Sequence, residues 1–586
     1  LGYVAVGLGY AGLLNAQAFC LFFIAVLLVG WRQFLGAIRW LGGTSKYLFG
    51  KTADCELQLL QGVFLALVAG TFVLCLFPEI SNDALAHHLN LPKRYLQEGK
   101  IAPLPFDIKS YQSLLMNSLY TVGLLLQGAA VAKGFHWGSG ILLVLGLILW
   151  IEQRTANRKL AYFMGLMLFL TPTLMNQLTT TYVDIGAALF LFLGVFFWIT
   201  ARESQGSFAK IIMAGILMGF SILSKLSTLL AIPGVAIIAC FDMFRRPSKY
   251  RTIALYLAFL TGMAITSGFF FIRNQLSTGD PLFPVFSQLA IEDFGKTMYD
   301  LGPPKTLLSY LLLPFYITFR PADYDYHHWI GPFYILALPF FIGSGFSRGR
   351  PAALMVFCFL YASGWYLGGQ NVRYLLPILP LYWVVAASGF HEFFDVKVIP
   401  KWMKHGGKTL GGGVLILLVA LTLFHFRWQG LSVLKQWDAE KYLRLTDRTY
   451  GIAEWANHRL PQDAHILSLA EVRLFYFDPK ITRASMYAQF IPAVTGLSRR
   501  ELANKLLEDG ITHILISYPV GRPFGFQGLM ISMPDLLAVC ERLVRLSSEN
   551  VREARYVYEL YDLRGNGTAR DLGSEFEQSA DGKVIT

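Results

Sequence analysis

Long runs of apolar residues recur through the first 426 residues of this chain and constrain its fold more than any other feature. A helix needs about 20 apolar residues to cross the hydrocarbon of a bilayer, and fewer where neighbours shield it. Hydrophobic residues make up 54% of the 586 residues and charged residues only 15%, which excludes a soluble globular protein of this size. The sequence therefore predicts a mainly α fold, a polytopic bundle of about 12 to 13 transmembrane helices. The predicted spans are 14–30, 57–77, 136–151, 160–176, 182–200, 208–223, 229–241, 253–272, 330–345, 352–367, 373–390 and 411–426.

Basic residues decide how two ambiguous apolar stretches, 113–131 and 304–319, are treated. Each could be a span or a helix lying at the membrane interface. If both lie at the interface, the Lys and Arg clusters all fall on one side, which is then the cytoplasmic side. Making only one of them a span would put basic clusters on both sides, so we reject that arrangement. The formal charge of +12 thus comes largely from Lys and Arg in the loops that face the cytoplasm, and we expect no nucleic-acid partner.

The composition changes after residue 426 to that of a small soluble domain. Residues 448–460 have the pattern of an amphipathic helix, and 464–470 and 512–518 that of strands, the second after a helix ending at Gly510. These elements predict a modest α/β domain on the extracytoplasmic side. The expected organisation is an N-terminal membrane helix and basic cytoplasmic loop at 1–56, a transmembrane domain at 57–426 with its first outer loop at 78–135, the soluble domain at 427–564, and a polar, disordered tail at 565–586.

The cysteines and the first residues add two expectations. Four of the six cysteines lie in apolar runs, Cys55 precedes one and Cys540 is alone in the C-terminal part, so we expect no structural disulfide. The chain opens at Leu1 without a basic region, and we do not interpret this opening as a signal peptide.

The first outer loop holds the most informative polar residues. Asp83 stands close to the end of a predicted span, where an unpaired carboxylate is costly unless it meets water, a cation or a metal. If the following residues continue as a helix, His87 lies one turn from Asp83, and His88 is adjacent. This pattern is typical of a catalytic or substrate-binding rim. The alternative is a membrane-surface helix whose polar face is solvated and has no functional role. This alternative stays open because Asp and His at this spacing are common.

A second carboxylate, Asp184, opens an apolar run on the same predicted side. Taken alone, it is best explained as a helix N-terminal residue stabilised by the macrodipole. Two acids brought to one rim by separate helices would nevertheless suit a general base beside a ligand for a metal or for a donor phosphate. We therefore treat Asp83 and Asp184 as candidate catalytic residues.

Cations on the same side form a complementary set of candidate substrate-binding residues. A guanidinium at the start of a span, as at Arg373, could bind a phosphate through two parallel hydrogen bonds, although snorkelling to the interface is an equal explanation. The set comprises Lys93, Arg94, Lys225, Arg273 and Arg373.

Ligand types suitable for a metal gather in the stretch PADYDYHHW. The spacing matches no zinc motif, so a divalent metal is only a weak candidate there. Its residues are Asp323, Asp325, His327 and His328. The sequence contains no Walker loop, dinucleotide fingerprint or serine nucleophile elbow, which disfavours nucleotide-driven chemistry.

An ordered set of motifs over about residues 57–520 resembles the type-C (GT-C) integral-membrane glycosyltransferases, including protein O-mannosyltransferases and the aminoarabinose transferase of lipid A. The motifs are NDALAHHLNLPKRYLQEGKI in the first outer loop, YVD at 182–184, GFSILSKLS at 219–227, IRNQLSTGDPLFP at 272–284, IGPFYILALP at 330–339 and RYLLPILP at 373–380. Each is weak alone, and their order is the specific feature.

The resemblance implies a polyprenyl-phosphate sugar donor, inverting transfer on the outer face and a first-loop aspartate as base. That aspartate is Asp83, Asp184 resembles the second acid near such sites, and Lys225, Arg273 and Arg373 are candidates for the donor phosphate. Many members have an Asp-Glu pair in the first loop, whereas Ala84 follows Asp83 here, so metal dependence is open. No WWD-type signature is present, which disfavours transfer of whole oligosaccharides to Asn.

The sequence therefore predicts a glycosyltransferase of a bacterial or archaeal plasma or inner membrane, with its active site and C-terminal domain extracytoplasmic. Its partners would be membrane lipids, a lipid-linked sugar donor and a glycan, lipid or protein acceptor. Two alternatives remain: a transporter or flippase of lipid-linked saccharide, and a non-catalytic subunit that kept only the scaffold.

Overall fold

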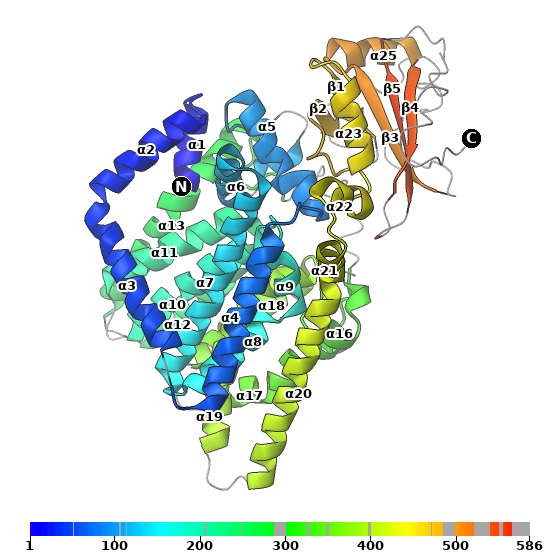
Figure 1. Ribbon diagram of the computed structural model, residues 1–586. Coiled ribbons are helices and arrows are strands. Elements are labelled where there is room, and N and C mark those ends of the chain that lie inside the picture. Colours follow the sequence, from blue (N-terminus) through cyan, green and yellow to red (C-terminus); the bar gives the residue numbers. More distant parts are fainter. Residues whose placement is uncertain are drawn as a thin grey trace. The chain divides into compact units, whose positions relative to one another are not determined.

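The structure is a computed structural model in which the described residues form two compact units (Figure 1). The helical unit comprises Leu1–Phe77, Tyr95–Ile101 and Gln112–Gln429, and the sheet unit comprises Pro78–Arg94, Ala102–Tyr111 and Gly430–Thr586. The tail predicted at 565–586 lies outside the described residues. Those residues are 1–50, 52–104, 107–112, 114–203, 207–245, 248–285, 301–324, 328–346, 351–395, 400–469, 471–483, 499–520, 540–549, 552 and 555–564.

Helices make up the regular structure of the helical unit. They are α1 (Gly2–Tyr10), α2 (Ala16–Val29), α3 (Trp31–Phe49), α4 (Cys55–Cys75), α6 (Leu114–Leu126), α7 (Ala129–Thr155), α8 (Arg158–Phe169), α9 (Pro172–Leu178), α10 (Asp184–Glu203), α11 (Phe208–Ser224), η3 (Leu226–Ala231), α12 (Ile232–Arg245), α13 (Lys249–Thr278), α15 (Leu307–Leu311), α16 (Leu313–Phe319), η4 (Pro321–Asp323), α17 (Phe333–Phe346), α18 (Pro351–Leu367), η5 (Val372–Ile378), α19 (Leu379–Asp395) and α20 (Lys401–His425). Two more helices, α5 (Asn90–Glu98) and α21 (Arg427–Leu434), have residues in both units.

Each predicted span corresponds to a described helix or to consecutive helices, but fewer of them are long than expected. Among the residues that the structure describes, six helices are long and apolar enough to cross a membrane, or up to 8 if two bent pairs each count as one span. The six are Cys55–Cys75, Ala129–Thr155, Asp184–Arg202, Leu226–Arg245, Lys249–Thr278 and Val372–Phe394. Four shorter apolar helices accompany them: Leu115–Leu126, Phe208–Ser224, Phe333–Ser344 and Ala352–Leu367. The other helices are shorter, since α11 and α18 have 17 residues each and α17 has 14, or they form the two bent pairs.

The two ambiguous apolar stretches form short helices. Residues 304–319 contain α15 and α16, of 5 and 7 residues, and neither is long enough to span. Residues 113–131 contain α6, of 13 residues, followed by the start of α7. These lengths agree with the interpretation that neither stretch is a full transmembrane helix.

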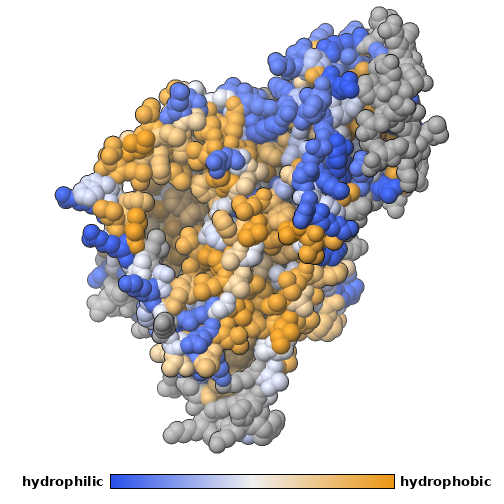
Figure 2. All heavy atoms as spheres, viewed as in Figure 1, coloured by the Kyte–Doolittle hydropathy of each residue, from blue (hydrophilic) through white to orange (hydrophobic). Residues whose placement is uncertain are grey.

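On the face seen in Figure 2, apolar side chains cover most of the described surface of the helical unit, as expected for a surface that faces lipid. Glycines let α11 and α13 approach closely inside it: a Cβ atom at Gly215 would lie 2.0 Å from the Phe259 carbonyl oxygen, and one at Gly262 would lie 2.4 Å from the Ile212 carbonyl oxygen. Small residues at facing positions are how membrane helices pack tightly. This packing fixes α11, whose C-terminus carries Lys225, against its neighbours.

The sheet unit contains five strands in the order β2-β1-β3-β5-β4. Its elements are η1 (Ala84–His88), η2 (Ile108–Tyr111), α22 (Ala439–Thr446), α23 (Tyr450–Arg459), β1 (His465–Ser468), β2 (Lys480–Arg483), α25 (Arg499–Glu508), β3 (His513–Pro519), β4 (Glu541–Ser547) and β5 (Tyr556–Asp562). Strands β2, β1 and β3 are parallel, and β5 pairs antiparallel with β3 and β4. Alternate residues of β3 pack against different helices, Ile514 in the cluster with α25 and Leu515 in the cluster with α23, so helices cover both faces.

The predicted C-terminal helices and strands are present in the sheet unit, with β1 and β3 adjacent and parallel. The sequence did not indicate that Pro78–Arg94 and Ala102–Tyr111, from the first outer loop, fold into the same compact unit. The six cysteines all lie among the described residues and are free thiols.

Candidate functional site

A buried charge cluster lies at helix ends in the helical unit. Asp184 begins α10, and its side chain is 2% exposed. Lys225 follows the last residue of α11, and its ammonium forms an ion pair and hydrogen bond with the Asp184 carboxylate. Arg373 stands in the first turn of η5, and both it and Lys225 act electrostatically on Asp184. The structure therefore brings together three of the predicted site residues.

Aromatic rings line this cluster. The Lys225 Nζ atom lies 4.0 Å from the centre of the Tyr374 ring, and the Arg373 guanidinium carbon lies 5.6 Å from the same centre. Arg373 is also 5.4 Å from the centre of the Tyr182 ring. Cations over aromatic faces are attracted to the ring quadrupole and keep their charge in a partly dry place. Tyrosine faces therefore help to hold two cations beside one carboxylate.

His136 is a buried histidine of α7 that orients the start of α10. Its Nδ1 atom lies 3.0 Å from the Gln177 carbonyl oxygen and 2.9 Å from the Thr180 carbonyl oxygen, so this nitrogen carries the proton. Its Nε2 atom accepts a hydrogen bond from the Ile185 backbone N–H at 3.3 Å. His136 thereby fixes the residue next to Asp184. Sequence reasoning missed it because a lone histidine inside an apolar helix gives no spacing pattern.

Two permanently charged side chains, Lys225 and Arg373, act on the Asp184 carboxylate, and so does the basic His328. In a buried environment such interactions between charges are strong. Arg373 offers a planar fork of donors and Lys225 a point charge, which are the two common partners of a phosphate.

Other predicted residues of the helical unit lie in different surroundings. Arg273 donates to the Asn274 side-chain oxygen at 3.1 Å and 2.8 Å and interacts with Tyr10 of α1. Asp323 pairs with Arg320 at 2.8 Å. Asp325 and His327 lie outside the described residues, and no metal-binding group of three ligands occurs among the residues that the structure describes. The metal site stays a prediction, and the described contacts of Arg273 are with Asn274, Phe270 and Tyr10 rather than with the Asp184 cluster.

Asp83 of the sheet unit precedes a π-helical turn, η1, rather than a regular α-helix. The Leu89 N–H donates to the Ala84 carbonyl oxygen at 2.8 Å, which closes this wider turn. Asp83 acts electrostatically on His87, as predicted from their spacing, and the His87 and His88 ring centres are 6.3 Å apart. Single π-turns are frequent at functional sites.

The pKa of His87 is held well below its usual 6.5, first by burial and then by the positive charges of Lys109 and Arg483. Asp83 opposes this shift but does not overcome it. His87 is therefore a neutral imidazole at physiological pH. His87 therefore places no positive charge beside Asp83.

Lys93 and Arg94 make structural contacts within the sheet unit. The Lys93 Nζ atom donates to the carbonyl oxygens of Phe475 at 3.1 Å and Phe477 at 2.9 Å, and it pairs with Asp478 at 2.9 Å. Arg94 lies 3.9 Å from the buried Asp107 carboxylate, and burial raises the pKa of Asp107. Their assignment to substrate stays a prediction, and these contacts direct both side chains toward protein groups.

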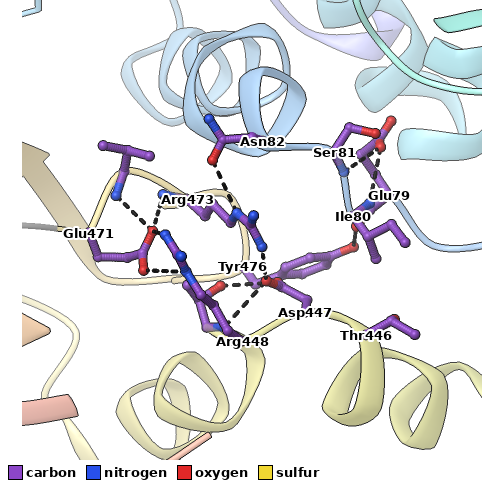
Figure 3. A network of polar contacts seen from close by, with 12 residues as sticks. Glu79, Ile80, Ser81, Asn82, Thr446, Asp447, Arg448, Glu471, Arg473 and Tyr476 are labelled. Atoms are coloured by element: carbon purple, nitrogen blue, oxygen red, sulfur yellow. Dashed lines mark hydrogen bonds and ion pairs between the residues drawn. The ribbon is translucent and has the colours of Figure 1, made fainter. Parts of the chain in front are cut away.

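A second buried network, drawn in Figure 3, was not foreseen. Glu471 pairs with the guanidinium of Arg448 through two contacts of 3.1 Å and 3.3 Å, and Asp447 lies 3.5 Å from Arg473. Burial raises the pKa of Asp447 to about 6. Here the carboxylates of Glu471 and Asp447 contact two guanidinium groups, and a third carboxylate in the same view, that of Glu79, accepts from the Ile80 and Ser81 N–H groups.

The fold is shared with solved membrane glycosyltransferases. ArnT from Cupriavidus metallidurans, the lipid A aminoarabinose transferase, matches in its complex with undecaprenyl phosphate with a TM-score of 0.55 and 14% identity, over 86% of this chain and 98% of that chain. Its apo structure matches with a TM-score of 0.53 and 14% identity, over 86% and 97%. The oligosaccharyltransferase AglB of Archaeoglobus fulgidus, in complex with an inhibitory peptide and a dolichol-phosphate, has a TM-score of 0.46 and 11% identity, over 77% and 69%.

Sequence comparison adds one match. A family described as a domain of unknown function, DUF8201, matches residues 116–302, and no curated protein matches the sequence. Together with the helices long enough to span a membrane, the ArnT likeness shows the fold class that the sequence predicted. The chain is an integral membrane protein with the GT-C fold and a small C-terminal sheet.

Proposed function

We propose that this protein is a membrane glycosyltransferase that moves a sugar from a polyprenyl-phosphate donor to an acceptor on the extracytoplasmic face. The observation that carries the proposal is the buried cluster in which Lys225 and Arg373 both act on the Asp184 carboxylate, in a fold whose ArnT example binds undecaprenyl phosphate. An ammonium and a guanidinium are the common protein partners of a phosphate.

The proposed reaction is a single displacement at the anomeric carbon. An acceptor hydroxyl or amine attacks this carbon, and the bond between the carbon and the phosphate oxygen breaks. The sugar is transferred with inversion, the acceptor's proton passes to a base, and polyprenyl phosphate leaves with the bonding electron pair. The chemistry needs no nucleotide, and the protein contributes proton removal and stabilisation of the leaving phosphate.

Named residues take these roles in the proposal. Asp83 is the base, in the position that the first-loop resemblance indicates, and it lies near the neutral imidazole of His87. Lys225 and Arg373 bind the leaving phosphate, and Asp184 holds the Lys225 ammonium in place through their ion pair. The prediction that Asp83 and Asp184 share one rim joins the two units and stays a prediction.

The test is sugar transfer by the purified full chain in lipid nanodiscs. The probes are undecaprenyl phosphates carrying different single sugars, with envelope lipid extract as acceptor, and released undecaprenyl phosphate is measured by mass spectrometry. We expect release by the wild type, a loss of at least about 100-fold in Asp83→Asn, and unchanged release in the exposed control Asp463→Asn. Equal release by Asp83→Asn would remove that residue from the role of base.

The same assay separates the alternative functions. Binding of undecaprenyl phosphate without any release would favour a non-catalytic subunit. Movement of an intact lipid-linked sugar between leaflets, with its anomeric bond unbroken, would favour a flippase.

A further inference from the structure

The segment that carries Asp83 is bonded to a single loop of the C-terminal domain, residues 472–478. Arg473 donates from Nε to the Asn82 side-chain oxygen at 3.1 Å, one residue before Asp83 (Figure 3). The backbone N–H groups of Leu474 and Phe475 both donate to the Leu85 carbonyl oxygen at 3.2 Å. Asp83 therefore lies between two points at which this loop holds its own segment.

The π-turn explains how this contact is made. In an α-helix the Leu85 carbonyl would accept from the Leu89 N–H. Here the Leu89 N–H donates to the Ala84 carbonyl instead, which leaves the Leu85 carbonyl for the two N–H groups of the loop. The local departure from α-helix and the contact with the C-terminal loop are thus one feature.

Two further contacts secure the ends of the same segment. The Tyr476 hydroxyl donates to the Glu79 carbonyl oxygen at 2.6 Å, as Figure 3 shows. The Lys93 ammonium donates to two carbonyl oxygens of the loop. The loop therefore contacts the segment before, around and after Asp83.

Glu471 anchors the loop to the rest of the domain. Its side chain is fully buried and accepts from the Val472 N–H at 2.8 Å, the Arg473 N–H at 3.0 Å and the Tyr558 hydroxyl of β5 at 2.9 Å. It also pairs with Arg448, just before α23. A carboxylate with this many donors has one orientation, so the loop that begins beside it is fixed as well.

Arg473 transmits this order to Asn82. Its guanidinium is 7% exposed and lies against Asp447, which is fully buried and accepts from the Thr449 N–H at 3.2 Å and the Thr449 hydroxyl at 3.0 Å. A buried guanidinium held on one side by a fixed carboxylate presents its other donors in a fixed direction. That direction leads to Asn82.

We infer that Arg473 is a positioning residue for the proposed base, holding Asn82 and thereby Asp83 in one orientation. The inference rests on the proposed function for its catalytic meaning. In this account the C-terminal domain contributes to turnover by holding Asp83 in position. A small displacement of a reacting group lowers the rate of turnover more than it lowers substrate affinity. Arg473 touches neither donor nor acceptor in this account.

The experiment compares Arg473→Ala and Arg473→Lys with the matched control Arg444→Ala in the full chain in nanodiscs. The described ion pairs of Arg444 are with Glu440, Glu454 and Glu549 in the same unit, and none of them is with residues 78–94. We expect Arg473→Ala to lower kcat by about 10-fold to 100-fold with KM for the lipid donor unchanged within about 2-fold. Arg473→Lys should recover part of kcat, and Arg444→Ala should leave both constants unchanged.

Hydrogen exchange of residues 79–93 supplies a readout that does not depend on transfer. We expect faster exchange there in Arg473→Ala and in Asn82→Ala, but not in Arg444→Ala. An unchanged exchange rate, or a wild-type kcat in Arg473→Ala while the wild type is active, would overturn the inference. If the wild type transfers no sugar, the proposed function fails and the exchange result still decides whether Arg473 holds the segment. If Arg473→Ala does not fold, Asn82→Ala gives the same two readouts with a smaller change.

Discussion

The two buried clusters of charged side chains in this protein, one in each unit, differ in the contacts that their carboxylates make. In the sheet unit, Glu471 and Asp447 meet Arg448 and Arg473, and the described contacts of Glu471 are all with protein donors. In the helical unit, two cations act on the Asp184 carboxylate. The first arrangement holds polypeptide in place, whereas we propose that the second binds an external anion. Burial of charge alone therefore does not mark a binding site.

The largest effect is expected from a substitution in the network of Glu471, Arg448, Asp447 and Arg473. Glu471→Gln removes the partner of a buried guanidinium, and breaking such a pair costs about 3–5 kcal/mol. We expect the free energy of unfolding of the sheet unit to fall by that amount, measured by hydrogen exchange of β1, β3 and β5 in the full chain. The exposed control Glu508→Gln should change it by less than about 0.5 kcal/mol. A loss below about 1 kcal/mol for Glu471→Gln would show that the network is not structural.

A smaller effect is expected from a substitution in the cluster of Asp184, Lys225 and Arg373. Arg373→Lys keeps the charge but loses the planar fork, so affinity for undecaprenyl phosphate should fall by about 10-fold while the helices stay folded. Native mass spectrometry of the protein in nanodiscs measures the binding, with the exposed Arg251→Lys as control. An unchanged affinity would contradict the assignment of Arg373 to the phosphate.

A further effect, of a size similar to the previous one, concerns the pH dependence of stability. The folded-state pKa of His87 lies below 6.5. As the pH falls through 6.5, His87 therefore binds a proton in the unfolded chain but stays neutral in the folded chain. His87 therefore makes the free energy of unfolding fall as pH decreases through 6.5, by up to about 1.4 kcal/mol per pH unit. We expect His87→Asn to remove this part of the slope in unfolding measurements between pH 7.5 and 5. An identical slope in wild type and variant would mean that His87 is not shielded from protons.

Much of the helical unit could be predicted, because the length of an apolar run is itself the structural constraint in a bilayer. The neighbourhood of Asp184, Lys225 and Arg373 followed from their positions at the ends of predicted spans. Strands β1 and β3 were predicted from compact apolar runs, whereas β2 was missed because KITR is only four residues long. Strands β4 and β5 carry several charged residues that mask their alternation.

The network of Figure 3 could not be predicted, because its contacts join residues far apart in the sequence. Asn82 and Arg473 are separated by 391 positions, and each is a single polar residue in an unremarkable context. The π-turn after Asp83 was equally hidden, since it depends on donors from residues 474 and 475. Such long-range polar contacts leave no periodic pattern.

The most direct test of the proposal that Lys225 and Arg373 bind the phosphate is a structure of the full chain with undecaprenyl phosphate bound. We predict that the phosphate lies within hydrogen-bond distance of both the Arg373 guanidinium and the Lys225 ammonium, with Lys225 still close to Asp184. A phosphate bound away from both cations would contradict the central claim, whatever the fold.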